Sequence, residues 1–272
     1  METPERLMEL RVPPGRPAEL AKRDPGSRLG LGDKQAGEAR LSELAAELSV
    51  LSNRLWAEGR RSLLLVLQGL DASGKDGTIS HVFKGVNPQS CRVHSFKEPA
   101  GVELAHDYLW RVHAACPQRG EVGIFNRSHY EDVVTVRVRE LAPERVWKRR
   151  PRHIRKFERM LVDEGTTVVK VFLNVSRDEQ RKRLEERLEN PEKAWKFRRE
   201  DIDDRARFDD YMAAYDEVLT ETSTDWTPWY VVPADRNWIR NLVVGELLVA
   251  ALHGIDPQLP TIDPQLEGLR IG

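Results

Sequence analysis

A glycine-rich segment with a single lysine is the clearest chemical signal in the chain. Residues 69–75 have the sequence GLDASGK, which matches the pattern GxxxxGK between the apolar run SLLLVLQ and a predicted helix. In this context the glycines let backbone N–H groups turn toward an anion, and the start of the helix adds partial positive charge. Lys75 would supply a mobile charge for phosphate oxygens. The segment predicts a Walker A loop, whose phosphate-binding residues besides Lys75 would be Gly69, Ala72, Ser73, Gly74, Asp76, Gly77 and Thr78.

Two acidic residues distinguish this segment from ordinary phosphate-binding loops. Asp76 stands where a serine or threonine usually holds Mg²⁺. Asp71 lies inside the loop, where a carboxylate repels phosphate unless a cation lies between them. Asp71 is therefore predicted to bind magnesium or to orient Lys75, with an Asx turn as the alternative. For Asp76, a favourable charge at the helix N-terminus is as good an explanation as metal binding.

A second polar segment, NRSHYED at 126–132, follows the apolar run EVGIF. The carboxyl ends of parallel strands meet at one edge of a sheet, so this segment should face the glycine-rich loop. Arg127 is placed to reach a phosphate, and Glu131 and Asp132 could hold a metal or act as a base, unless they are only helix-start charges. His129 lies beside them, but transfer to a phosphate oxygen needs little proton abstraction, so we expect no phosphohistidine.

Basic residues gather in two places that could bind a polyanion. The alternative for both is a solvated helix face with i,i+4 ion pairs. The stretch NPEKAWKFR within the second adds aromatic residues typical of a mobile lid or a plain hinge. Single lysines at Lys84 and Lys97 are expected near the carboxyl edge of the sheet. The first cluster is Lys148, Arg149, Arg150, Arg152, Arg155, Lys156 and Arg159, and the second is Arg177, Arg181, Lys182, Arg183, Arg187, Lys193, Lys196, Arg198 and Arg199.

Apolar runs and helical patterns alternate along the chain, as expected of an α/β fold with a doubly wound parallel sheet. The predicted strands are 62–68, 91–96, 121–126, 167–175 and 229–234. The predicted helices are 38–58, the segment after Gly74, 103–113, 143–164 and 236–252, with further helices before the last strand. A Pro- and Gly-rich segment over 1–35 is expected to be an arm that lies on the surface or against a partner subunit, followed by a core over 36–255 and a tail over 256–272.

Composition excludes several classes of protein. Among 272 residues, 43 Lys and Arg oppose 44 Asp and Glu, so the net charge of −1 disfavours a generic nucleic-acid coat protein. The mean hydropathy is −0.56, and we expect neither a membrane span nor an N-terminal signal peptide, hence a cytoplasmic protein. Cys91 and Cys116 belong to no metal or disulfide pattern and are expected to be ordinary buried or half-buried thiols.

Five motifs together resemble the polyphosphate kinase 2 family: GLDASGKDGT, NPQSCRVHSFKEP, IFNRSHYEDV, FLNVSRDEQRKRL and NPEKAWKFR. The resemblance covers about residues 35–255. It implies a P-loop kinase with a thymidylate-kinase-like core, a helical lid at about 177–200, and phosphoryl transfer between inorganic polyphosphate and nucleotides with Mg²⁺, or Mn²⁺ in its place. The form NRSHYEDV, where DRSxYNR is more frequent, resembles the class III branch, which phosphorylates nucleoside mono- and diphosphates.

The resemblance also implies roles for single residues. Asp71 and Lys75 correspond to the Walker A acid and lysine, and Arg127 to the Walker B arginine. Asn126 occupies the usual Walker B aspartate position, and because it carries no charge, Glu131 or Asp132 would compensate as the metal ligand.

The expected reaction is direct in-line transfer from polyphosphate to AMP, giving ADP, and to ADP, giving ATP. The sequence leaves the preferred direction open. Adenine nucleotides, with guanine next, are the expected acceptors, and we expect a homo-oligomer that binds neither nucleic acid nor membranes. An ATP-dependent nucleoside monophosphate kinase is the alternative, which Asp76 disfavours. A non-catalytic polyphosphate- or nucleotide-binding regulator is a further alternative, and it would not need Asp71, Lys75 and Arg127 together.

Overall fold

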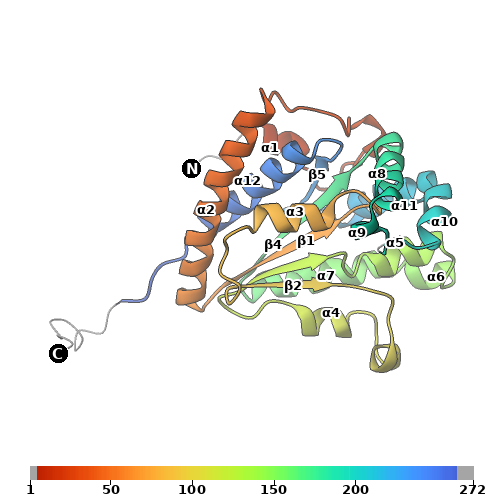
Figure 1. Ribbon diagram of the computed structural model, residues 1–272. Helices are drawn as coiled ribbons and strands as arrows, with labels where there is room; N and C mark the ends of the chain where they lie inside the picture. The colour runs from red at the N-terminus through yellow and green to blue at the C-terminus, as the bar shows by residue number, and fades with distance from the viewer. Residues whose placement is uncertain (1–4, 196, 262–272) are drawn as a thin grey trace.

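The centre of the molecule is a parallel sheet of five strands, as the sequence predicts (Figure 1). The computed structural model describes residues 5–195 and 197–261. The strands are β1 (Ser62–Gln68), β2 (Cys91–Ser95), β3 (Val122–Asn126), β4 (Thr166–Asn174) and β5 (Trp229–Pro233), in the order β2-β3-β1-β4-β5. Every residue of β1 is buried, because the central strand of a parallel sheet is covered on both faces. Leu67 of β1 pairs with Asn126 of β3, so both strands end at the same edge.

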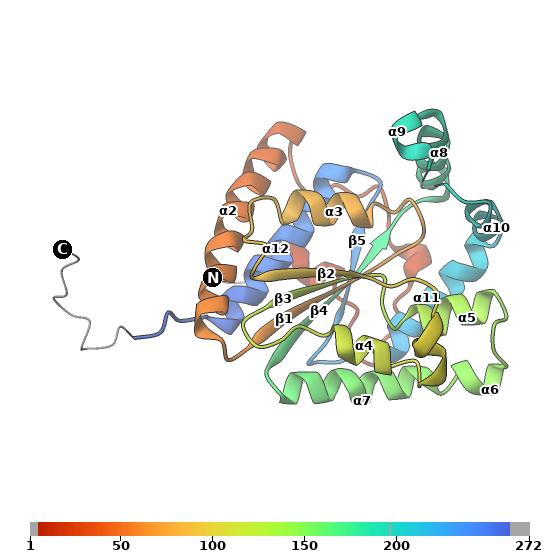
Figure 2. The ribbon, with the colours of Figure 1, turned by 60° about the horizontal axis from the view of Figure 1, so that its bottom comes forward.

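Helices cover both faces of the sheet (Figure 2). One face carries α2 (Lys34–Glu58), α3 (Lys75–Val82) and α12 (Asn237–Ile255), and the other carries α4 (Trp110–Ala115) and α7 (Arg150–Asp163). Two more helices, α5 (Glu131–Val138) and α11 (Phe208–Thr222), pack against each other. The remaining short helices are α1 (Glu5–Leu10), η1 (Leu20–Lys22), η2 (Gly101–Ala105), α6 (Glu144–Trp147), α8 (Arg177–Glu189), α9 (Pro191–Ala194) and α10 (Glu200–Ala206).

Helix α12 is apolar enough, and long enough, to cross a membrane by those criteria alone. This differs from the expectation that the chain contains no segment of that length and apolar composition. The helix packs between α2 and the sheet, and 72% of its apolar stretch is buried inside the fold. Core packing therefore accounts for its composition.

Residues 5–35 do not form the surface arm that the sequence predicts. Leu7 and Val12 are fully buried in the main core, and Arg11 forms an antiparallel bridge with Tyr230 of β5. The segment thus covers one edge of the sheet. Its apolar residues lie among prolines and glycines without a sustained helical period, so their burial could not be predicted from the sequence.

Two predicted helices are interrupted. The helix expected over 143–164 is α6 followed by α7, because Pro151 favours the first turn of a new helix. The one expected over 103–113 is split into the end of η2, a loop over 106–109 and the start of α4. Cys91 and Cys116 are half-buried free thiols, as expected.

Candidate active site

The glycine-rich loop lies between the end of β1 and the start of α3. Gly69 and Gly74 have φ values of 153° and 100°, which favour glycine. A Cβ on Gly69 would stand 2.7 Å from Ser73 Oγ and 2.9 Å from the Leu173 carbonyl oxygen. The loop therefore needs these glycines, and it delivers Lys75 at the first position of α3.

The Lys75 side chain folds back over the loop. Its ammonium group donates hydrogen bonds to the carbonyl oxygens of Gly69, at 2.6 Å, and Leu70, at 3.0 Å. Burial, together with the nearby charge of Arg127, lowers the pKa of Lys75 to about 8. The lysine is thus a desolvated cation, and a phosphate anion would stabilise its charged form.

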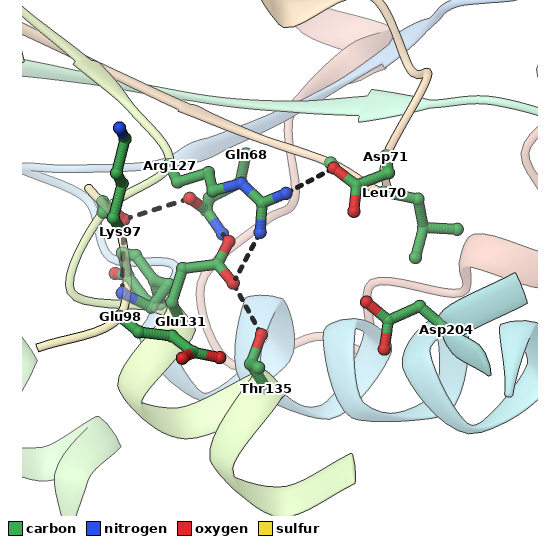
Figure 3. A network of polar contacts seen from close by, with 12 residues as sticks. Gln68, Leu70, Asp71, Lys97, Glu98, Arg127, Glu131, Thr135 and Asp204 are labelled. Atoms are coloured by element: carbon green, nitrogen blue, oxygen red, sulfur yellow. Dashed lines mark hydrogen bonds and ion pairs between the residues drawn. The ribbon is translucent and has the colours of Figure 1, made fainter. Parts of the chain in front are cut away.

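Arg127 joins the two polar segments. It follows β3 with a left-handed φ of 63° and forms ion pairs with Asp71 in the loop and, at 3.5 Å, with Glu131 (Figure 3). Burial alone would raise the pKa of the Asp71 carboxyl, but the charges of Arg127 and Lys75 hold that pKa below its usual value. Asp71 is therefore ionised, as a carboxylate ligand for a metal ion would be.

The two residues that differ from commoner phosphate-binding kinases contact each other. The Asn126 side-chain amide donates a hydrogen bond of 2.8 Å to the Asp76 carboxylate. An aspartate at position 126 would repel that carboxylate, whereas the amide holds it without added charge. Asn126, at the end of β3, and Asp76, in the first turn of α3, therefore form a hydrogen-bonded pair without added charge.

Gln68, the last residue of β1, was missed by the sequence analysis. Its side-chain amide donates to Glu131 Oε1 at 3.1 Å and to the Tyr215 hydroxyl at 3.2 Å, and it accepts from the Ser128 hydroxyl. Gln68 thus fixes Glu131 beside Arg127. The available signal was a polar residue that ends an otherwise apolar strand.

Asp132 does not join this group of residues. It forms ion pairs with Arg111 of α4 at 3.3 Å and with Arg150 of α7 at 3.8 Å. Burial raises the pKa of Asp132 despite both arginines. The expectation that Asp132 is a metal ligand loses its support, because its contacts are with helices on the other face of the sheet.

Within the part of the chain that the structure describes, no group of three or more His, Cys, Asp or Glu side chains could hold a metal ion. Asp71, Asp76 and Glu131 remain as single carboxylates around the loop. This suits Mg²⁺, which proteins usually hold with one or two carboxylates, substrate phosphates and water.

The two single lysines occupy opposite edges of the sheet. Lys97 follows β2, whose Ser95 pairs with Asn126 at the carboxyl edge, as expected. Lys84 follows the C-terminal end of α3, and the chain then enters β2 at the amino edge. The expectation for Lys84 is wrong because an eight-residue helix carries the chain about 12 Å away from the loop.

The lid candidates separate into different environments. Arg177 pairs with Asp209, Arg187 lies 3.6 Å from Asp201, Lys193 is exposed, and Lys196 lies outside the described residues. Arg183 instead contacts the loop itself. Arg181 and Lys182 form i,i+4 pairs with Glu185 and Glu186, which is the solvated alternative.

The first basic cluster also forms local pairs. Lys148 contacts Glu144 and Arg159 contacts Asp163, each at i,i+4. Arg150 forms an ion pair with Asp132, as described above. These contacts favour a solvated helix face for this part of the cluster.

Comparison with known proteins agrees with this geometry. Residues 32–260 match the sequence model of a family described as polyphosphate kinase 2 (PPK2). The chain is 53% identical to an AMP/ADP-polyphosphate phosphotransferase of Meiothermus ruber, with 93% of this chain and 96% of the relative covered. It is 44% identical to an ADP-polyphosphate phosphotransferase of Rhodopseudomonas palustris, with 80% and 79% covered. A crystal structure of polyphosphate kinase 2 from Arthrobacter aurescens superposes with a TM-score of 0.91 at 42% identity, covering 97% of this chain and 94% of that one.

Proposed function

The chain belongs to the polyphosphate kinase 2 family, and we propose that it transfers phosphoryl groups from inorganic polyphosphate to AMP and ADP. The observation that carries the proposal is the placement of Lys75 and the Asp71–Arg127 ion pair at one edge of the sheet, next to the lid arginines. Desolvated cations gathered at one edge of the sheet can form charge-assisted hydrogen bonds to phosphate groups.

The residues of the site support direct transfer. Lys75 and the N–H groups of the loop would hold the terminal phosphoryl group, and Arg127 would exchange Asp71 for a phosphate oxygen. An oxygen of the acceptor nucleotide's phosphate attacks phosphorus while the bond to the next polyphosphate unit breaks. That oxygen is already deprotonated at neutral pH, so no base is needed. The position of His129 agrees with a transfer that needs no base, because this residue is fully buried against Glu158.

Magnesium, with Mn²⁺ as a substitute, is the proposed cofactor. Asp71 would hold it, with Asp76 or Glu131 as the second carboxylate, because these side chains surround the loop. When bound, the ion would neutralise charge on the phosphate oxygens. We expect the Asp71→Asn variant to need a higher Mg²⁺ concentration for half-maximal rate, by about tenfold, since one charged ligand is lost. An unchanged magnesium titration would leave Asp71 with only a structural role in the loop.

The donor is tested by leaving out every nucleoside triphosphate. With ADP, long-chain polyphosphate and Mg²⁺, we expect ATP to form, resolved by chromatography. An ATP-dependent monophosphate kinase could form ATP and AMP from two ADP molecules, so the control is the same mixture without polyphosphate, in which we expect no ATP. A non-catalytic regulator would bind the ligands without forming product. Absence of ATP would therefore overturn the proposed function, and a parallel reaction with AMP tests the monophosphate activity.

Other features of the proposal follow from the same family and chemistry. We propose adenine nucleotides as preferred acceptors, with guanine next, and a cytoplasmic homo-oligomer that binds neither nucleic acid nor membranes. Polyphosphate would lie along the lid, at Arg187 and Lys193 and near Lys97 at the sheet edge. The role of Lys196, which lies outside the described residues, stays a prediction, and Arg177 would act after release from Asp209.

A further inference from the structure

The carbonyl groups of the Walker A loop are held by side chains from two distant helices. Gln180 of α8 donates a hydrogen bond of 3.1 Å to the first of the three carbonyl oxygens at 71–73. Arg183, one turn further along α8, donates to the second and third at 3.2 and 3.3 Å. Arg240 of α12 donates to the third at 3.3 Å. We call Gln180, Arg183 and Arg240 the carbonyl bracket.

Arg183 has no donor left for a phosphate. A guanidinium group carries five N–H donors. Nε donates to Glu179 at 2.9 Å, Nη1 to the two loop carbonyls, and Nη2 to the carbonyls of Ala234 and Asp235 at 2.7 and 2.9 Å. Arg183 therefore joins the loop to the segment between β5 and α12, which differs from the expectation that it grips polyphosphate.

Arg240 is a buried cation directly behind the loop. Its side chain donates to the Asn237 and Asn241 side-chain oxygens, and no carboxylate among residues 5–195 and 197–261 lies within ion-pair distance. A Cβ built on Gly74 would stand 1.9 Å from Arg240 Nη1, so the loop has no room to move toward α12. Burial, with the charge of Arg183, lowers the pKa of Arg240 to about 9, and a phosphate anion on the other side of the loop would offset that cost.

Holding the carbonyl groups also sets the direction of the N–H groups. In a trans peptide the C=O of one residue and the N–H of the next point in opposite directions. The Ser73 N–H closes a turn on the Leu70 carbonyl at 3.1 Å. The N–H groups of Ala72 and Gly74 are then directed away from the bracket, toward the side where a phosphate would bind.

We propose that Arg183 and Arg240 are positioning residues, which act on both substrates through the Walker A loop, and that Arg187 is the lid arginine that binds the polymer. The proposal rests on the proposed function. Gln180, Arg183 and Arg187 share one face of α8 at i, i+3 and i+7. Arg187 lies beyond the bracket, and among the described residues its ion pair is with Asp201 at 3.6 Å, which a phosphate can replace.

The experiment compares three arginines of one helix, each replaced by methionine, which keeps the length and removes the donors. For Arg183→Met we expect the half-saturating concentrations of polyphosphate and ADP to rise by the same factor, about tenfold, because a charged hydrogen-bond group is lost from the loop. The slope of binding against salt should stay unchanged. For Arg187→Met, only the half-saturating concentration of polyphosphate should rise. The slope of log affinity against log salt concentration should fall by about 0.7 per lost phosphate contact.

Arg181→Met is the matched control, since Arg181 lies on the same helix and pairs with Glu185 in solvent. We expect it to match the wild type. If Arg183→Met raises only the polyphosphate value and lowers the salt slope, Arg183 is a polymer ligand and the proposal fails. If Arg183→Met matches Arg181→Met, the bracket has no functional role and the proposal also fails.

Arg240→Lys provides a second variant for the buried side of the bracket. Lysine keeps the charge but cannot reach the loop carbonyl and both asparagine side chains together. We expect it to weaken tripolyphosphate binding about tenfold, measured by calorimetry without nucleotide, with a melting temperature near that of the wild type. Wild-type binding by Arg240→Lys would overturn its positioning role. Calorimetry does not depend on turnover, so a wild type that binds tripolyphosphate but transfers nothing would contradict the proposed function alone.

Discussion

The Lys75→Ala variant should lose phosphoryl transfer from polyphosphate to ADP by on the order of 10³-fold, because it removes the cation nearest the loop carbonyls from a desolvated site. A factor of this size corresponds to about 4 kcal/mol of transition-state stabilisation. The fold should survive, since among the described residues the ammonium group donates its hydrogen bonds to loop carbonyl oxygens and not to the core. Initial rates with saturating substrates, together with the melting temperature, measure both parts of the expectation.

Lys84→Ala is the matched control for this prediction. Lys84 is an exposed lysine at the far end of the same helix, so its loss should leave the rate within about twofold and the stability unchanged. Near-normal turnover by Lys75→Ala would show that the loop is not the phosphoryl-transfer site. Equal losses in both variants would point to damage to α3 instead of lost chemistry.

Strands β1 and β4 could be predicted because burial on both faces leaves a simple pattern. The run SLLLVLQ at 62–68 coincides with β1, and the apolar part of 167–175 lies within β4. The glycine pattern then located the loop, since a strand followed by glycines and a helix has one common arrangement. These signals are local, and each lies within about ten residues of sequence.

The division of roles between Glu131 and Asp132 could not be predicted in this way. Adjacent residues of a helix point about 100° apart, so only one of the two can face the loop. The choice is set by the left-handed turn at Arg127 and by Gln68, which holds Glu131. Neither this turn nor the hydrogen bond from Gln68 can be recognised from the residue types of 126–132.

The basic residues of α8 pose the same difficulty at longer range. Arg181 and Arg183 are two positions apart in one charged cluster, yet one pairs in solvent and the other holds the loop carbonyls. Arg183 meets carbonyl groups more than 50 residues away on both sides along the chain. The cluster of basic residues predicted that this helix lies near phosphate. Which residue contacts which partner depends on tertiary packing.

The largest effect on stability should come from a buried ion pair behind the second polar segment. Lys170 of β4 and Glu158 of α7 are 0% and 1% exposed and lie 2.7 Å apart. Glu158 also accepts hydrogen bonds from Tyr130 and Thr227, so it joins the loop after β3 to the core. Lys170→Met should lower the free energy of unfolding by about 3–5 kcal/mol at pH 7, because it leaves Glu158 charged and without its cation.

The pH dependence identifies the cause of that loss. Burial would raise the pKa of Glu158, but Lys170 and His129 hold it at about 2. In the wild type this carboxylate therefore contributes stability above its unfolded pKa of about 4.5, and the contribution is lost as pH falls toward 2. Without Lys170, burial is opposed less and the pKa of Glu158 in the folded state rises above its wild-type value, so protonation relieves the unpaired charge at a higher pH than in the wild type.

We therefore expect the difference in unfolding free energy between the wild type and Lys170→Met to narrow as pH falls from 7 to about 4. The control is the double variant Lys170→Met with Glu158→Leu, which removes both charges. It should recover much of the lost stability at pH 7, and its difference from Lys170→Met should shrink in acid. Denaturant unfolding at several pH values measures all three proteins. A constant difference across this range would mean that lost packing, and not the unpaired carboxylate, destabilises Lys170→Met.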